Sequence, residues 1–358
     1  MQMNPQFISV LQHFPLMGNA VSCEPYGSGH INVTYLVVTD TGKRYILQKL
    51  NTTAFKNIDG LMRNVQLVTA YLQTKKLPGQ EVLTLVPTVD GSAYAKEAEG
   101  CWRLYDFVEN SLCLQTPEND NDFYESALAF GGFAQMLNGF PVEQLHETIV
   151  NFHNTPDRYR MFHEVLEKDS MGRAKDVQEE IAFVLAREAE MGTLQRMRDS
   201  GELPSRVTHN DTKLNNVLFN AQNRKALCVI DLDTVMPGLS LYDYGDSIRF
   251  GAATAAEDEK DLDKVTMSLD RFRVYTRGYL EACPDLTEQE IAMMPMGAKT
   301  MTLECGMRFL TDYLDGDHYF AVHREGHNLD RCRTQFKLVA DMEDKWEQMQ
   351  AIVQEERK

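Results

Sequence analysis

The chain has 358 residues, of which 43% are hydrophobic and 25% are charged, so it is long and apolar enough to bury one large core or two medium cores. Its formal net charge is −17, which excludes a general positive surface for nucleic acid or anionic membrane. Phosphate groups can still bind locally, through backbone amides and a metal ion.

Strands dominate the first hundred residues. Segments 31–40 and 43–50 flank Thr41-Gly42 and are rich in β-forming residues, which predicts a β-hairpin. A helix is expected near 58–73. Two or three further strands are expected over 83–108, with turns that contain glycine between them.

Helices dominate from about residue 118. Three segments carry apolar residues at steps of three or four, which is the spacing of one buried helix face. We expect one helix in each of residues 177–201, 262–279 and 336–352. Short strands return between these helices, in NNVLF and ALCVID.

The order of these elements predicts an α+β fold with two lobes. The small β-rich lobe covers residues 1–107, and the large α-rich lobe covers residues 108–358. Seven cysteines occur without a CxxC pair, which predicts free thiols in a reducing compartment. No signal peptide and no run of 18 apolar residues is seen. We expect a cytoplasmic monomer with no membrane or nucleic-acid partner.

One polar stretch lies directly before an apolar strand, in VTHNDTKLNNVLF. His209, Asp211 and Asn216 form the pattern H-x-D-x-x-x-x-N, and Asp231 ends the strand ALCVI fifteen residues after Asn216. A hairpin through the turn NAQNRK would bring Asp211, Asn216 and Asp231 to one end of a small sheet. Buried polar groups cost free energy unless they are paired, so the stretch is either a well-satisfied set of Asx turns or a site.

Metal-assisted phosphoryl transfer suits this set of residues. The reaction needs Mg²⁺ on the phosphate oxygens and a carboxylate that takes the proton of the attacking hydroxyl. Asn216 and Asp231 offer the hard oxygen ligands that Mg²⁺ prefers, which leaves Asp211 as the base. His209 is expected to brace the loop.

HNDTKLNN followed by VIDLD resembles the superfamily of small-molecule phosphotransferases that includes aminoglycoside phosphotransferases and choline kinases. The resemblance implies a protein-kinase-like fold with ATP between the lobes. It places the base at Asp211 and the Mg²⁺ ligands at Asn216 and Asp231. It also matches Gly238 and Asp243, and implies that Asp243 braces the catalytic loop.

Further blocks extend this resemblance over nearly the whole chain, among them EPYGSGHINVTYLV, YGDSIRFGA and LECGMRFLTDYLDGDHYF. Together they resemble N-acetylhexosamine 1-kinases. This implies phosphorylation of the anomeric C1 hydroxyl of N-acetylglucosamine or N-acetylgalactosamine, with ATP and Mg²⁺. The implied sugar contacts are His30, Asp246, Arg308 and Tyr319. From spacing alone, Asp246 and Arg249 are equally expected to form a surface ion pair beside the brace Asp243. Asp315 and Asp317 are expected to be solvated.

The nucleotide contacts depart from the kinase pattern. Gly27 and Gly29 permit a turn over phosphates, but Asn32 stands in place of the third glycine. Strand alternation places Gln48 where the phosphate-binding lysine usually lies, with Lys49 on the other face. Either the register slips or that lysine is missing, and no helix glutamate partner is evident.

Two other parts of the chain are expected to contact the nucleotide. Lys213 follows the base by two residues and could supply the missing charge to the γ-phosphate. Adenine is expected at the backbone from Asp106 to Val108.

Two alternative functions stay open from sequence. The first is a kinase for another small hydroxyl acceptor, such as an amino alcohol or an aminoglycoside. The second is a nucleotide-binding pseudokinase that acts as a scaffold, against which the intact Asp211, Asn216 and Asp231 argue.

Overall fold

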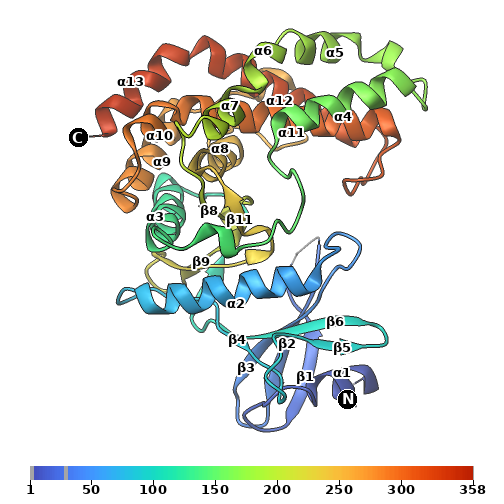
Figure 1. Cartoon of the computed structure of the whole chain (residues 1–358), viewed down its shortest axis with the longest axis vertical. Helices are drawn as coiled ribbons and strands as arrows, with labels where there is room; N and C mark the ends of the chain where they lie inside the picture. Colours follow the sequence, from blue (N-terminus) through green and yellow to red (C-terminus); the bar gives the residue numbers. More distant parts are fainter. Residues whose placement is uncertain (1–3, 28–30, 358) are drawn as a thin grey trace.

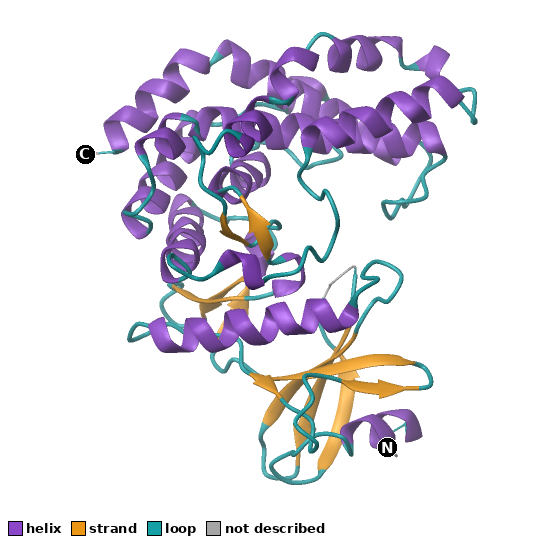
Figure 2. Ribbon diagram, viewed as in Figure 1, coloured by secondary structure: helices purple, strands orange, loops and turns teal. Residues whose placement is uncertain are grey.

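The computed structural model describes residues 4–27 and 31–357 and has a mixed α+β architecture. Figure 1 shows an antiparallel sheet at one end, helices at the other, and helix α2 between them. Figure 2 shows that, beyond this sheet, strands occur only as short pieces between the helices. The expected α+β fold with a β-rich N-terminal part and a helical C-terminal part is confirmed, and the lobe boundary at residue 107 stays a prediction.

The strands are β1 (Ala20–Pro25), β2 (Val33–Thr39), β3 (Arg44–Lys49), β4 (Leu85–Val86), β5 (Ala95–Glu97), β6 (Gly100–Asp106), β7 (Ser111–Cys113), β8 (Arg206–Thr208), β9 (Val217–Asn220), β10 (Ala226–Val229) and β11 (Met236–Gly238). The helices are α1 (Pro5–Leu11), α2 (Ile58–Lys75), α3 (Asp120–Met136), α4 (Thr155–Lys168), α5 (Gln178–Leu185), α6 (Glu188–Met191), α7 (Thr193–Asp199), α8 (Ser240–Gly251), α9 (Leu269–Ala282), α10 (Glu288–Ala292), α11 (Met294–Asp315), α12 (His327–Asp344) and α13 (Trp346–Glu356).

The six-stranded sheet is antiparallel, in the order β1-β2-β3-β6-β4, with β5 also paired to β6. The predicted hairpin is confirmed, since β2 pairs with β3 around a turn in which Gly42 has φ +83°. A positive φ is where glycine is favoured. In the next pairing of the sheet, Gln48 of β3 lies opposite Arg103 of β6.

Strand alternation gives the sheet two different faces. Leu47 and Leu104 lie in a fully buried cluster with Val10 of α1, whereas Ile46 and Tyr105 pack with α2 and the helical part. By the same alternation, Gln48 and Arg103 lie on the α2 face. The sequence-based placement of Gln48 and Lys49 on opposite faces is therefore correct, because Lys49 stacks on the Trp102 ring of the α1 face.

Helix α2 spans the junction between the sheet and the helical part. The Asn57 side chain caps it by accepting the N–H of Gly60, 2.9 Å away. The buried face of α2 contributes Val65 and Val68 to a cluster that also contains Val235, from the loop before β11. This apolar contact joins the two parts of the chain.

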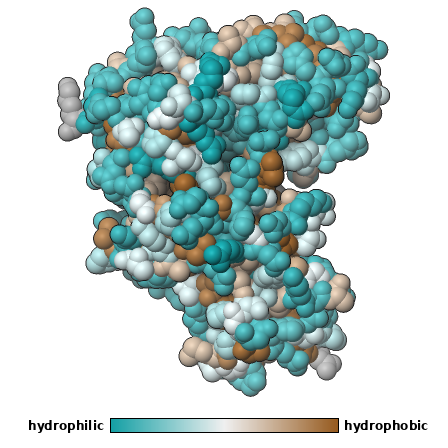
Figure 3. Space-filling view, viewed as in Figure 1, coloured by the Kyte–Doolittle hydropathy of each residue, from teal (hydrophilic) through white to brown (hydrophobic). Residues whose placement is uncertain are grey.

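In the helical part, α3, α8, α9 and α11 pack around one buried core. Helices α4, α5 and α12 pack around the C-terminal half of α11. The described residues contain no helix that combines the length and apolar character needed to cross a membrane. The face shown in Figure 3 is mostly hydrophilic, with scattered apolar residues. All seven cysteines are free, as expected, and four of them are buried.

Three predicted helices are wrong in extent. Residues 177–201 form three short helices, α5 to α7, which break at Arg187 and Gly192. Residues 336–352 form parts of α12 and α13, which break at Lys345. The amine of Lys345 binds Asp341 and the carbonyl of Met267, so the residue at which the helix breaks makes a tertiary contact.

The third wrong segment is residues 262–279. It begins with a 3-10 turn at Leu262–Lys264, and α9 starts only at Leu269. Ser268 caps α9, and Met267 forms a β-bridge with Ala253. Val265 and Met267 are buried outside any helix, and Leu262 lies in the 3-10 turn, so the apolar spacing before Ser268 matched an α-helix by coincidence.

Helices α8 and α11 cross at glycines, and this crossing brings the two polar helix faces of the candidate site together. A Cβ on Gly245 would lie 2.4 Å from the carbonyl oxygen of Gly297, and one on Gly297 would lie 2.9 Å from the carbonyl oxygen of Leu241. Neither position has room for a side chain without a backbone shift.

Gly245→Ala should therefore lower the free energy of unfolding by about 1–3 kcal/mol, because the added methyl meets a backbone carbonyl. Urea unfolding monitored by circular dichroism measures this. The matched control is Gly132→Ala in α3, where the added Cβ would meet only the end of Gln80 at 3.9 Å, and where alanine should be neutral or stabilising. Equal stability of the two variants would contradict this account of the crossing.

Candidate functional site

The polar loop after β8 is held by the residues around it. His209 lies between the rings of Phe130 and Phe133 and is fully buried. Its Nε2 donates to the carbonyl of Ile230 at 2.8 Å, and its Nδ1 accepts the N–H of Asp211 at 3.3 Å. These contacts are what a brace would make, and they connect the loop to the segment that carries Asp231.

Asp243 of α8 holds the same loop from the other side. Its carboxylate accepts the backbone N–H groups of His209 at 2.8 Å and Asn210 at 2.7 Å. Burial raises the pKa of Asp243 to about 6, against the lowering effect of His209 and these two backbone donors. Asn210 has φ +65°, and its amide binds the carbonyl of Thr234 at 2.8 Å. The loop is thus fixed in a conformation that few residues adopt.

Asp211 projects from this loop as a paired carboxylate. Lys213 lies 3.0 Å from its Oδ1, and the amide of Asn216 donates to its Oδ2 at 3.0 Å and to its main-chain carbonyl at 2.8 Å. Burial acts to raise the pKa of Asp211, but Lys213, His209 and Asn216 outweigh it and the pKa is lowered. Asp211 is therefore ionised, as a general base must be.

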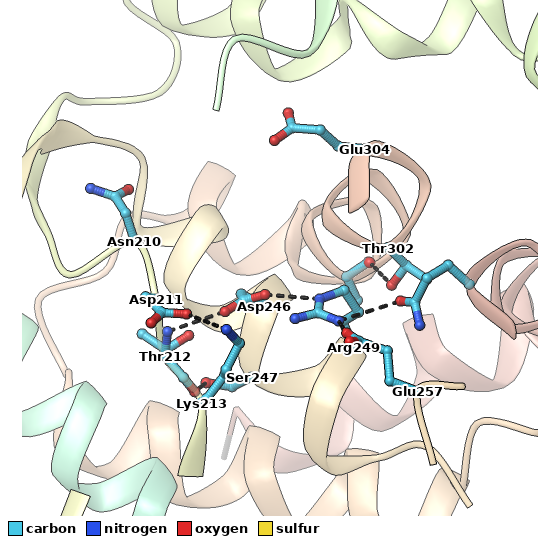
Figure 4. A network of polar contacts seen from close by, with 12 residues as sticks. Asn210, Asp211, Thr212, Lys213, Asp246, Ser247, Arg249, Glu257, Thr302 and Glu304 are labelled. Atoms are coloured by element: carbon cyan, nitrogen blue, oxygen red, sulfur yellow. Dashed lines mark hydrogen bonds and ion pairs between the residues drawn. The ribbon is translucent and has the colours of Figure 1, made fainter. Parts of the chain in front are cut away.

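Lys213 is held at the same place by charge. Asp211 raises the pKa of Lys213, so the amine stays protonated beside the carboxylate. Figure 4 shows this contact next to Asp246. The lysine is in reach of the base, and its predicted contact with a γ-phosphate stays a prediction.

Asp231 follows β10 and lies close to Asp211. It has φ +59° and begins the 3-10 turn Leu232–Thr234. The carbonyl of Asn216 accepts the N–H of Ile230 at 2.9 Å, which ties the two predicted metal ligands together. Burial, Asp233 and Asp211 raise the pKa of Asp231 to about 7. A buried carboxylate with two acidic neighbours is a place where a cation is favourable.

A divalent cation fits these donors. The amide nitrogen of Asn216 faces Asp211, which leaves the amide oxygen of Asn216 and the carboxylate of Asp231 as hard oxygen ligands. Within the described ranges, no group of three or more His, Cys, Asp or Glu side chains is placed to bind a metal. Two protein ligands completed by water and phosphate oxygens is the arrangement that Mg²⁺ commonly uses.

Asp246 of α8 lies beside the loop after β8, and both of its carboxylate oxygens accept hydrogen bonds. It accepts the N–H of Thr212 at 3.2 Å and the Nε of Arg249 at 2.9 Å, and Arg249 continues to Glu257 at 2.7 Å (Figure 4). The pair with Arg249 is buried, not on the surface. These contacts are those of a brace, and the contact of Asp246 with a sugar stays a prediction.

Arg308 of α11 contacts Tyr319, which follows α11. The Arg308 Nη2 donates to the Tyr319 hydroxyl at 3.3 Å, and its guanidinium lies over the rings of Phe152 and Phe320 at 5.3 and 5.4 Å. Tyr319 is 61% exposed. Arg308 and Tyr319 thus lie together among aromatic rings, and their contact with a sugar stays a prediction.

Asp312 sets the position of Tyr319. Its carboxylate accepts the N–H groups of His318, Tyr319 and Phe320 at 2.7–2.9 Å. The expectation for Asp317 is wrong, because it pairs with Arg173 at 2.7 Å and is partly buried. Asp315 is exposed, as expected.

Two further groups at this site have no signal in the sequence. Glu304 of α11 is fully buried and binds His153 at 2.8 Å and Thr155 at 2.6 Å, and the other ring nitrogen of His153 donates to the carbonyl of Asn210 at 3.1 Å. Arg158 of α4 donates to the carbonyl of Phe152, whose ring lies under Arg308. Burial and Arg308 lower the pKa of Arg158.

On the sheet side, Gln48 binds Thr34 at 3.0 Å and accepts the Nε of Arg103 at 2.9 Å. Arg103 is fully buried and pairs with Asp233, two residues after Asp231. No sequence pattern predicts this arginine at the site, because it comes from β6, which is the neighbour of β3 in the sheet but not in the chain. The described residues contain no lysine paired with Gln48 or Asp233.

The other predicted nucleotide contacts are only partly placed. Gly27 has φ +75° with open space where a Cβ would be, and Gly29 and His30 lie outside the described residues. The N–H of Asp106 binds the carbonyl of Thr84, and the carbonyl of Val108 accepts the Ser111 hydroxyl. The adenine contacts at Asp106 and Val108 stay predictions.

Asp243→Ala should lower the free energy of unfolding by about 2–4 kcal/mol, since it leaves two buried backbone N–H groups without their acceptor. Chemical denaturation measures the effect. Asp315→Ala, at an exposed position of α11, is the control and should change stability by less than about 0.5 kcal/mol. If the two variants unfold at the same denaturant concentration, Asp243 does not hold the loop.

Comparison with known proteins gives one family and a consistent set of folds. A model of the phosphotransferase enzyme family matches residues 22–271. The structure of a microcompartment-associated aminopropanol kinase is similar, with a TM-score of 0.65 and 18% identity over 97% of this chain and 98% of that one.

Two more solved structures share the fold. A spectinomycin phosphotransferase, in complex with ADP and spectinomycin, has a TM-score of 0.58 and 12% identity over 96% of this chain and 98% of that one. An amicoumacin kinase, in complex with AMP-PNP and Ca²⁺, has a TM-score of 0.59 and 14% identity over 95% of this chain and 92% of that one.

Proposed function

Because the chain belongs to the phosphotransferase enzyme family and is a small-molecule kinase that acts on hydroxyl acceptors, we propose that its acceptor is an N-acetylhexosamine. It would transfer the γ-phosphoryl group of ATP to the anomeric C1 hydroxyl of N-acetylglucosamine or N-acetylgalactosamine. The expected cytoplasmic location and monomeric state stay predictions.

The observation that carries the transfer is the geometry of Asp211. It is ionised, it is held by His209 and Asn216, and it lies beside two oxygen ligands for Mg²⁺. In the proposed reaction, Asp211 orients the acceptor hydroxyl and takes its proton as the oxygen attacks the γ-phosphorus. Asn216 and Asp231 would hold Mg²⁺, which when bound neutralises charge on the phosphate oxygens.

Lys213 supports the same step in two ways. It keeps Asp211 ionised, and it supplies a positive charge at the place where a γ-phosphate would approach the base. This charge is needed because the strand position of the usual lysine holds Gln48, whose amide is neutral.

The acceptor class is supported by charge and by aromatic surface beside His153, which binds the carbonyl of Asn210. Arg308 and Arg158 both contact Phe152, one through its ring and one through its carbonyl. Two guanidinium groups disfavour a cationic acceptor such as an aminoglycoside or an amino alcohol. A neutral N-acetylhexosamine offers hydroxyl and carbonyl oxygens to arginine and an apolar ring face to Tyr319 or Phe320.

The second candidate is a kinase for an amino alcohol. Its support is the similarity in fold to an aminopropanol kinase, and at 18% identity this similarity shows the fold alone. The acids Asp233, Asp246 and Glu304 are already paired with Arg103, Arg249 and His153. Asp211 is paired with Lys213, so an ammonium group would have to compete with these cations.

With ATP, Mg²⁺ and N-acetylglucosamine or N-acetylgalactosamine, the wild-type chain should form a sugar phosphate, and Asp211→Asn should lower kcat by about 10²–10⁴-fold because the proton acceptor is lost. ATP affinity, measured by calorimetry, should stay unchanged. Asp315→Asn is the charge-matched control at an exposed site. Turnover of Asp211→Asn at the wild-type rate would remove Asp211 from the mechanism.

Lys213→Met should move the acidic limb of the kcat/KM profile to higher pH. Lys213 lowers the pKa of Asp211, so its removal raises that pKa and the base is protonated over a wider acidic range. Lys337→Met, at an exposed position of α12, is the control. An unchanged profile with unchanged KM for ATP would show that Lys213 affects neither the base nor the phosphates.

A further inference from the structure

A buried ion pair joins the sheet to the segment that carries Asp231. Arg103 of β6 and Asp233 of the 3-10 turn after β10 are 1% and 3% exposed. Burying two charges costs several kcal/mol per ion, so such a pair is weak evidence of a gain in stability. Its position two residues after a metal ligand points to another role.

Asn32 engages the second oxygen of the same carboxylate. Its amide nitrogen donates to the Asp233 Oδ2 at 2.6 Å, and its amide oxygen accepts the N–H of Asn51 at 3.0 Å. Asn32 stands where the third glycine of a phosphate-covering loop would be. One carboxylate therefore ties the start of β2 and the middle of β6 to the turn that follows Asp231.

These contacts also give the two aspartates of the motif IDLD, Asp231 and Asp233, different environments. Arg103 donates to Oδ1 of Asp233 and Asn32 donates to Oδ2, so each oxygen of Asp233 already has a hydrogen-bond donor, one of them cationic. Asp231 has no hydrogen-bond partner for its carboxylate among the described residues, and it has the left-handed φ of +59°. The first acid is left free for a cation while the second holds the backbone around it.

Gln48 is a further partner of Arg103. Arg103 donates from Nε to Gln48, which occupies the strand position of the usual phosphate-binding lysine. The neighbouring strand thus supplies the cation on this face of the sheet. The Arg103 Nη1 pairs with Asp233, in the turn after Asp231, and also lies 3.9 Å from the sulfur of Met62 in α2.

We propose that Arg103, Asn32 and Asp233 form a latch that positions the start of β2 and the sheet over Asp231, in place of the lysine–glutamate pair of kinase-like small lobes. All three are positioning residues that act through Asp231. The inference rests on the proposed binding of a nucleotide–metal complex, and it does not depend on which acceptor is phosphorylated.

The paired variant Arg103→Met with Asp233→Asn tests the latch. It removes one positive and one negative charge, so the net charge near Asp231 is preserved, and asparagine keeps an acceptor for Asn32. Because neither partner is left alone, the cost of an unpaired buried charge is avoided. A change in metal-dependent binding then reports position and not charge.

The readout is the affinity of a fluorescent ATP analogue with Mg²⁺ and with EDTA, beside a thermal melt. We expect the paired variant to melt close to wild type, and to lose about 10–100-fold of its affinity with Mg²⁺, the usual effect of removing a group that orients a metal ligand. Its affinity in EDTA should be unchanged. Arg103→Lys, which keeps the charge, should recover part of the loss.

The control pair is Lys96→Met with Asp59→Asn. It removes the same charges from an exposed contact of 3.7 Å between β5 and α2, and it should bind as wild type does. Asn32→Ala breaks the second arm of the latch alone and should weaken only the Mg²⁺-dependent affinity, so it decides the question should the paired variant not fold.

Wild-type affinity of the paired variant and of Asn32→Ala with Mg²⁺ would overturn the latch, and so would an equal loss with Mg²⁺ and in EDTA. No acceptor is present in this assay. An error in the proposed acceptor would therefore be detected in the product assay, and an error in the proposed latch would be detected in this binding assay.

Discussion

The carboxylate of Asp243 is the contact on which the arrangement of the site depends. By accepting the N–H groups of His209 and Asn210, it fixes the loop at a point where Asn210 has a left-handed backbone conformation. Asp211 follows directly and so takes its direction from this clamp. The clamp is itself rigid because α8 packs on α11 without a side chain at Gly245 or Gly297.

Charge balance explains the rest of the site. Asp211, Asp231 and Asp233 lie near one another, and buried acids of one sign are unfavourable together unless cations offset them. Lys213 offsets Asp211 and Arg103 offsets Asp233. Asp231 is left with a raised pKa, and a nucleotide-bound Mg²⁺ would supply its counter-charge. The acid that would bind metal is thus the one without a protein cation of its own.

Local spacing was enough to predict that the polar residues after β8 and β10 lie together. His209, Asp211 and Asn216 lie within eight positions, and Asp231 follows after one hairpin, so neighbouring strands bring them together with little help from tertiary contacts. The β2–β3 hairpin and the facing of Gln48 were predictable for the same reason, since they follow from a turn and from strand alternation.

The residues that were missed reach the site from distant parts of the chain. Arg103 and Asp233 are 130 positions apart in the sequence, and Glu304 and His153 are 151 positions apart. No local pattern therefore predicts either pair. The predicted helix ends were wrong for a related reason. The last predicted helix breaks at Lys345, whose amine binds the carbonyl of Met267. The spacing of apolar residues cannot predict a contact of this kind.

The most direct test of the proposed acceptor is the structure of the product. After incubation of the wild-type chain with ATP, Mg²⁺ and an equimolar mixture of N-acetylglucosamine, N-acetylgalactosamine, choline and an aminoglycoside, two-dimensional ³¹P–¹H NMR identifies the phosphorylated hydroxyl. The account predicts a phosphate coupled to the anomeric proton of an N-acetylhexosamine. A phosphate on choline, on the aminoglycoside or on another sugar hydroxyl would contradict it.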